Sequence, residues 1–186
     1  MKFFKFLLLI ILLPIGCDDD DNPMVQNPNP SSCDEGFIEN PLSGNEYEQC
    51  VPNDFTYYIS QSQAHLFLLH VKLDNEAIDS GDWVGAFKDS NGDGDGDVCV
   101  GAILWNPDNC NSSTCAITLM GESGTSDNTN GYLQEGDIPI FKIFDTSTLS
   151  YFNVYATQPP ILFSHGNSYM HDLAGCSDGD DPVDVS

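Results

Sequence analysis

The chain contains no arginine and few lysines. Its 186 residues include five lysines against 29 acidic residues, which gives a formal net charge of −24. Two of the lysines, Lys2 and Lys5, lie at the extreme N-terminus. Because proteins bind nucleic acid with cationic side chains that neutralise phosphates, nucleic acid is excluded as a partner. Helical periodicity is also missing, since no stretch repeats apolar residues at the spacing of a three-turn helix.

Motifs of catalysis and cofactor binding are missing as well. The chain holds no G-x-S-x-G motif, P-loop or dinucleotide fingerprint, and it has no C-x-x-C pair of the kind that indicates zinc. Among the four histidines, His65 and His70 lie five residues apart, so a regular strand would direct them to opposite faces. His165 and His171 flank a turn, and one hypothesis is a hydrolase whose site they form together with distant acidic residues. We favour the absence of catalysis.

The N-terminal segment is the first positive feature. An apolar run over 6–13 follows the two lysines and is too short to span a bilayer. A glycine then precedes Cys17, and four aspartates follow at once. This pattern resembles bacterial lipoprotein signals, in which cleavage before the cysteine is followed by acylation of its sulfur, as with palmitate, and of the new N-terminus. The resemblance implies a lipid on Cys17, although Pro14 stands where that family prefers leucine; the alternative is an ordinary secretory signal.

Composition divides the rest of the chain. Residues 1–16 are the expected signal peptide, and 17–32 are an acidic, proline-rich tether. Residues 33–54 are expected to be irregular, 55–176 to form the folded domain, and 177–186 to be a disordered acidic tail. Removal of the signal leaves three lysines and all 29 acids, hence a formal charge of −26. Such a charge opposes binding to anionic lipids, so membrane attachment has to come from acyl chains.

Cysteine is abundant for a chain of this length. If Cys17 carries lipid, six cysteines remain, and an even number in an exported chain indicates disulfides. We expect a Cys110–Cys115 bridge first, because only four residues separate the two, and a Cys33–Cys50 bridge second. Cys99 lies in an apolar strand and is either a buried free thiol or the partner of Cys176.

Short apolar segments separated by Gly, Pro and Asn turns account for most of the domain. About nine strands are expected, at 55–60, 64–73, 83–87, 98–105, 115–121, 137–145, 150–157, 161–165 and 168–173. Such a series predicts an all-β fold, an antiparallel β-sandwich of the Ig-like or jelly-roll-like kind, braced by disulfides. The segment 64–73 is apolar at alternate positions of both faces, which is typical of a central buried strand.

The segment 89–97, DSNGDGDGD, carries an oxygen-bearing side chain at every second position. These side chains are Asp89, Asn91, Asp93, Asp95 and Asp97. Intervening glycines allow the chain to curl, and Ca²⁺ prefers six to eight oxygen ligands. The segment matches the first half of an EF-hand loop but has Val100 where the bidentate glutamate is required. We predict calcium bound in a loop between strands; the alternative is a solvated acidic hairpin tip.

Aromatic side chains are a further candidate for binding. A sugar-stacking platform could be formed by Trp83, Trp105, Tyr132, Tyr151, Phe152 and Tyr155. Aromatic residues at strand spacing are more often core residues or cross-strand pairs, which is the interpretation we favour.

Residues 81–145 resemble a β-rich module of secreted and surface proteins from Bacteroidetes and related marine bacteria. The resemblance rests on GDWVGAF at 81–87, CVGA at 99–102 and GDIPIFKIFD at 136–145. The inserted Asp/Gly loop and Phe144, where tyrosine is usual, depart from the pattern. Members are mostly of unassigned function, so the resemblance implies fold and location more than activity. The acidic run after Cys17 similarly resembles the surface-export signal of Bacteroidetes lipoproteins.

Together these features predict a lipoprotein of the outer membrane, exposed on the cell surface. Its β-sandwich is expected to bind calcium and to serve adhesion by binding a glycan or a protein partner without catalysis. One alternative is a structural or secretion-accessory envelope protein with no ligand, and loss of the anchor would make the chain freely secreted. The hydrolase is the least favoured interpretation.

Overall fold

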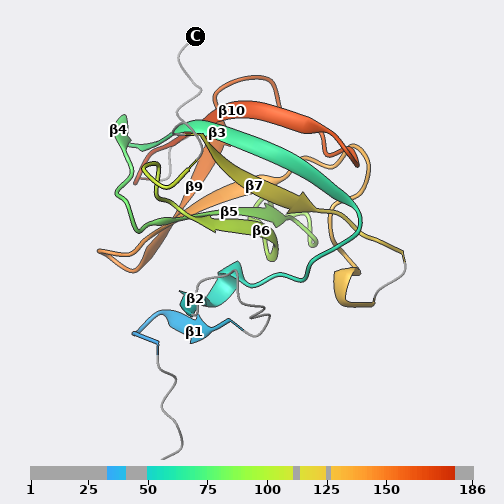
Figure 1. Cartoon of the computed structure of the whole chain (residues 1–186), viewed down its shortest axis with the longest axis horizontal. Helices are drawn as coiled ribbons and strands as arrows, with labels where there is room; N and C mark the ends of the chain where they lie inside the picture. Colours follow the sequence, from blue (N-terminus) through green and yellow to red (C-terminus); the bar gives the residue numbers. More distant parts are fainter. Residues whose placement is uncertain (1–32, 41–49, 111–113, 125–126, 179–186) are drawn as a thin grey trace, which may run out of the picture. The chain divides into compact units, whose positions relative to one another are not determined.

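The structure is a computed structural model that describes residues 33–40, 50–110, 114–124 and 127–178 (Figure 1). The described residues all belong to one compact unit. The expected signal peptide, Cys17, the tether and residues 179–186 of the tail lie outside the described residues. Within the described ranges, no helix is long and apolar enough to cross a membrane.

The described chain is all-β, as predicted. Its elements are β1 (Phe37–Glu39), β2 (Cys50–Pro52), the 3₁₀ turn η1 (Asn53–Phe55), β3 (Gln63–Leu73), β4 (Glu76–Ala77), β5 (Trp83–Lys88), β6 (Val98–Leu104), β7 (Cys115–Met120), the 3₁₀ turn η2 (Asp127–Thr129), β8 (Ile140–Asp145), β9 (Ser150–Ala156) and β10 (Ser168–Gly175).

Two expected strands are not strands. Residues 161–165 have no partner ladder among the described residues, and neither do 56–60, which follow η1. The backbone of 56–60 is satisfied by side chains instead: Tyr58 N–H donates to Tyr132 Oη at 2.7 Å and Ser60 N–H donates to Met120 Sδ at 3.4 Å. The β-branched and aromatic composition of 56–60 therefore predicted an extended segment correctly, but no described strand forms a ladder with it. Residues 33–54, expected to be irregular, contain the paired strands β1 and β2.

Eight strands form one curled sheet. Its order is β4-β3-β10-β9-β8-β5-β6, and β7 pairs with β3. Figure 1 shows β3, β7 and β10 in one layer and β5 and β6 in the other. The sandwich-like fold is confirmed, but the sheet is mixed, because β10 runs parallel to β3. Strand direction was wrong at this one pair because apolar alternation records which face is buried and not which way a strand runs.

Close approach of β6 and β7 completes the curl. At Gly101 in β6, an added Cβ would collide with the carbonyl oxygen of Thr118 in β7. Only glycine permits the two strands to lie this close. The main core fills the space between the layers and includes Leu66, Val84, Ile117, Ile143 and Leu173.

Strand β5 is buried on both faces. Its inner face joins the main core, and its outer face is covered by a second cluster that contains Phe55, Trp83, Phe87 and Phe144. The Phe55 ring lies directly over Gly85, where an added Cβ would be 2.8 Å from it. The expectation that 64–73 is the doubly buried strand was wrong, since β3 leaves Leu69 40% exposed.

Both disulfides expected from the sequence are present. Cys33–Cys50 ties the chain before β1 to β2, and Cys110–Cys115 closes the connection between β6 and β7. Of the two alternatives for Cys99, the structure has the buried thiol, and no bridge joins it to Cys176. Burial raises the pKa of the Cys99 thiol to about 12, with a smaller opposing effect from a backbone hydrogen bond with Gly101.

Candidate functional site

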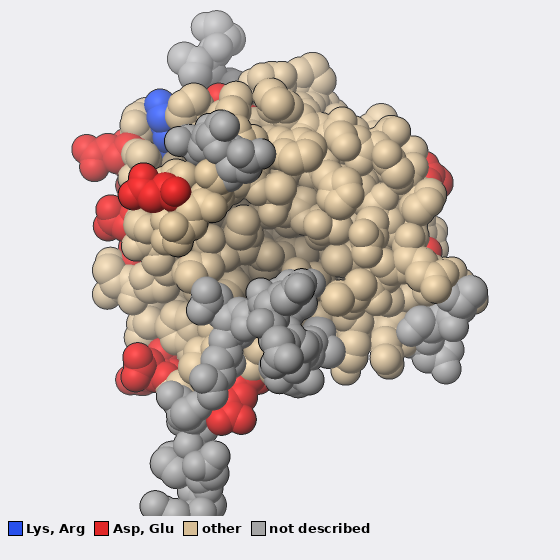
Figure 2. All heavy atoms as spheres, viewed as in Figure 1, with Lys and Arg blue, Asp and Glu red and all other residues tan. Residues whose placement is uncertain are grey.

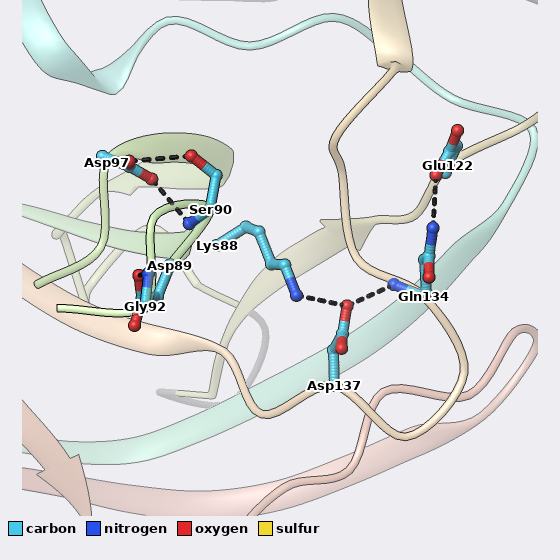
Figure 3. Close-up of polar contacts among 8 residues, drawn as sticks. All are labelled: Lys88, Asp89, Ser90, Gly92, Asp97, Glu122, Gln134 and Asp137. Carbon is cyan, nitrogen blue, oxygen red and sulfur yellow. Dashed lines mark hydrogen bonds and ion pairs between the residues drawn. The ribbon is translucent and has the colours of Figure 1, made fainter. Parts of the chain in front are cut away.

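The acidic loop, defined here as residues 89–97, connects β5 to β6 and satisfies its own backbone. Asp89 accepts hydrogen bonds from the N–H groups of Gly92 at 2.6 Å and Gly94 at 2.9 Å. These two contacts hold the pKa of the Asp89 carboxyl below its usual value. Asp97 accepts from the N–H and hydroxyl of Ser90, which lowers its pKa in the same way (Figure 3).

Asn91, Asp93 and Asp95 each direct one side-chain oxygen to a partner within the protein. Asn91 Oδ1 accepts from Asp93 N–H at 2.9 Å, and Asp93 Oδ1 accepts from Asp95 N–H at 2.8 Å. Asp95 forms an ion pair with Lys142 at 2.6 Å. The described residues contain no group of three or more His, Cys, Asp or Glu side chains arranged to hold a metal ion. Calcium binding by this loop stays a prediction.

A second polar junction involves Asp137, which the sequence analysis did not single out as a site residue. Lys88 Nζ lies 2.8 Å from Asp137 Oδ2, and Gln134 N–H donates to the same oxygen at 2.7 Å (Figure 3). Burial alone would raise the pKa of Asp137, but these two donors outweigh it and lower the pKa. The junction ties β5 to the turn before β8, so its evident role is structural.

The histidines do not form a common site. The pairing of β3 with β10 places Leu68 opposite His171 and Val71 opposite Leu173, so β3 carries one extra residue between them. This bulge breaks the alternation, and both His65 and His70 are exposed. The expectation of opposite faces was therefore wrong.

The individual contacts of the histidines also separate them. His70 Nδ1 lies 3.2 Å from Asp172, whereas His65 Nδ1 lies 3.4 Å from the Thr118 hydroxyl. His171 is partly buried, which lowers its pKa, and its Nδ1 has no hydrogen-bond partner among the described residues. Each histidine therefore has different surroundings, as expected for residues that do not share a ligand.

Ser164 lies next to His165, one of the two histidines of the hydrolase hypothesis. Glu135 accepts hydrogen bonds from the Ser164 hydroxyl and from the His165 backbone N–H, the second at 2.8 Å. His165 Nδ1 accepts from the N–H of Gln63 at 3.2 Å. The serine proton is thus directed to a carboxylate, and the histidine ring to a backbone amide. This geometry differs from a nucleophile bonded to its general base.

The aromatic residues considered for sugar stacking are separated by the fold. Trp83, Trp105 and Tyr132 are buried. Tyr151, on β9, packs against Phe144 with ring centroids 4.8 Å apart. The three buried residues are therefore core residues and cannot join a platform, whereas Tyr151 and Tyr155 remain exposed on β9, at 39% and 36%.

The described part of the chain contains a cleft of about 460 Å³. It lies beside β6, β7 and the segment 55–59, and its polar groups are amides and hydroxyls, such as those of Asn106, Asn109 and Thr118. Not one of the described residues that line it is Asp, Glu, Lys, Arg or His. Figure 2 shows a hollow among neutral residues on this face, with acidic residues toward the margins.

The cleft follows from the local sequence. Gly85 admits Phe55 under the segment that forms one wall, and Gly101 admits β7 beside β6. This site escapes prediction from sequence because its described residues come from five separated segments and carry no charge. The two glycines within strand patterns were the available signal, since glycine there often marks a close approach of another chain segment.

No protein-family model, curated protein or solved structure matches the chain. The resemblance to the Bacteroidetes module and to lipoprotein signals therefore remains a prediction from sequence.

Proposed function

We propose that this protein is a non-catalytic binding module, displayed on the bacterial outer membrane by a lipid on Cys17. The single observation that carries the binding role is the charge-free cleft. In a chain with 29 acidic residues, a hollow lined by neutral amides, hydroxyls and apolar groups is suited to a neutral ligand. Its described lining residues supply no carboxylate, imidazole or amine for proton transfer, which favours binding over catalysis.

The binding role is tested with the full chain in detergent. The chain is applied to arrays of glycans and of secreted or surface proteins, and binding is repeated with an Ile59→Lys variant. Ile59 lines the cleft and is 60% exposed, so the added charge changes the ligand site without burial of a lysine. We expect a bound ligand whose affinity falls in the variant. Absence of any ligand would instead support the structural envelope protein.

The anchor is tested separately. Growth with labelled palmitate should label the wild-type chain, and Cys17→Ser should remove the label and release the protein from the membrane. An unlabelled wild-type chain would contradict the anchor, and the binding role would then belong to a secreted protein.

Calcium at the acidic loop is a prediction with its own test. A calcium ion at the loop would share the Asp89 oxygens with the N–H groups of Gly92 and Gly94. Calorimetric titration compares wild type with the Asp93→Ala/Asp95→Ala double variant. The matched control, Glu76→Ala/Asp108→Ala, removes the same charge from other exposed positions. Calcium that binds the native loop should also raise the melting temperature; equal heats from all three proteins would contradict the prediction.

A further inference from the structure

We propose that the cleft binds an extended polypeptide segment, which adds as a new strand to the free edge of β6. This inference rests on the binding role proposed above and names its ligand. The segment belongs to a partner protein, and it is neutral where it fills the cleft and basic on its flanks.

The cleft runs along the edge of β6. Ala102, Ile103 and Leu104 all line it, although they are consecutive in one strand. Ala102 and Leu104 pack with the outer cluster, whereas Ile103 packs with the main core, so their side chains lie on opposite faces. A hollow can touch all three only from the edge. Strand β7 contributes alternate residues, Ala116, Thr118 and Met120, and thus presents one face to the cleft.

This edge has backbone groups available for pairing. Within the described chain, β6 pairs only with β5. Trp105 N–H donates to the carbonyl of Asp82 at 2.7 Å, on the β5 side. Backbone direction alternates along a strand, so the N–H and C=O of Ala102 and Leu104 face the free edge. An added strand would pair with these groups.

Among the residues that the structure describes, this edge also lacks the usual protection against added strands. At β4, the sheet ends in two residues, one of which is Glu76. Short length and charge are typical protections of an edge strand. The β6 bulge lies at Val100, where Ala86 pairs with Gly101 and Phe87 with Cys99. It precedes the cleft, so the segment from Gly101 to Leu104 remains regular and uncharged.

Charge selects the occupant. The chain carries a net charge of −24, so a second copy or an acidic peptide is repelled. Asp54 and Asp108 are exposed beside the lining residues Phe55 and Asn109. They favour lysine or arginine on the flanks of a segment whose centre is neutral.

A neutral glycan is the competing ligand, and the aromatic residues argue against it. Sugar rings bind against exposed aromatic faces, but Phe55 and Trp83 in the lining are 1% and 6% exposed. Tyr57 alone among the described lining residues retains a partly exposed ring. Backbone pairing thus offers more to a ligand here than ring stacking does.

The experiment begins with a random library of short linear peptides, selected on the full chain in detergent. Selected peptides are then synthesised with N-methyl groups at alternate backbone positions. One alternate set should abolish binding and the other should retain it, because only every second amide of an added strand faces β6. Equal tolerance of both sets would overturn the proposal.

Two matched variants locate the site. Ile59→Lys places a charge in the cleft, and Ile138→Lys places one at a similarly exposed isoleucine outside it, the wild-type residues being 60% and 54% exposed. We expect Ile59→Lys to weaken peptide binding about tenfold or more and Ile138→Lys to change it less than about twofold. Equal effects of the two variants would overturn the proposal.

A glycan array read with the same variants separates the two proposals. One outcome is that a neutral glycan binds wild type but not Ile59→Lys, while no peptide binds at the cleft. This outcome would overturn strand addition and would still support the proposed binding function. If neither ligand binds, both proposals fail.

Discussion

The acidic loop carries four carboxylates and the described lining of the cleft carries none, and the polar groups of these two regions are used differently. In the loop, carboxylates accept hydrogen bonds from nearby backbone amides and pair with Lys142. Along the cleft, the β6 edge pairs on one side only. A dense motif is therefore not by itself a binding surface, whereas unpaired groups beside a neutral hollow are available to a ligand.

The largest expected effect concerns the wall of the cleft. Phe55 is buried and lies over Gly85, so Phe55→Ala should lower the free energy of unfolding by about 3–5 kcal/mol and disrupt ligand binding. The control is Tyr58→Ala, because Tyr58 is 44% exposed and should cost less than about 0.5 kcal/mol. Urea denaturation measures both. Equal costs would show that the second cluster does not support the cleft.

A smaller loss is expected at the contact of β6 with β7. Gly101→Ala would place a methyl group against the carbonyl of Thr118, and the resulting displacement should cost about 1–3 kcal/mol. Ligand binding should weaken in parallel, because the same displacement moves the β6 edge. Unchanged stability in thermal and urea denaturation would contradict the close approach.

Alkaline pH tests the buried thiol beside the cleft. Cys99 has a pKa raised to about 12 in the fold from a usual value of 9.0, so the unfolded chain ionises first. Between these values the unfolded chain binds fewer protons, and stability should fall by about 1.4 kcal/mol per pH unit. The Cys99→Val variant should lack this fall in stability, because it has no thiol to ionise. An identical pH dependence of the two proteins would contradict burial of the thiol.

The smallest effect is expected in the acidic loop. Asp89→Asn should lower the melting temperature slightly, because a neutral amide accepts hydrogen bonds from Gly92 and Gly94 more weakly. The pKa of Asp89 is depressed in the fold, so this contribution is present above the usual value of 3.8 and is lost as pH falls below it. The melting temperatures of wild type and variant should therefore differ at neutral pH and become equal at acidic pH. Ligand binding at the cleft should not change.

Some of this structure was accessible from sequence because it depends on local chemistry. Short apolar segments between turns predicted an all-β fold, and spacing alone identified Cys110–Cys115. The parallel pairing of β3 with β10 and the bulge near His70 were not accessible, because both depend on contacts between segments about a hundred residues apart. The role of Asp82, in the GDWVGAF segment, was also not accessible from sequence. Asp82 accepts hydrogen bonds from the backbone N–H groups of Asp79 and Thr146 and so holds two turns in place.

The central claim is that the β6 edge, and not the acidic loop, receives the ligand. Amide hydrogen exchange of the full chain, measured with and without a selected peptide, tests it directly. We predict slower exchange at Ala102 and Leu104 in the complex and unchanged exchange over 89–97. Protection of the loop, with the β6 amides unaltered, would contradict the claim.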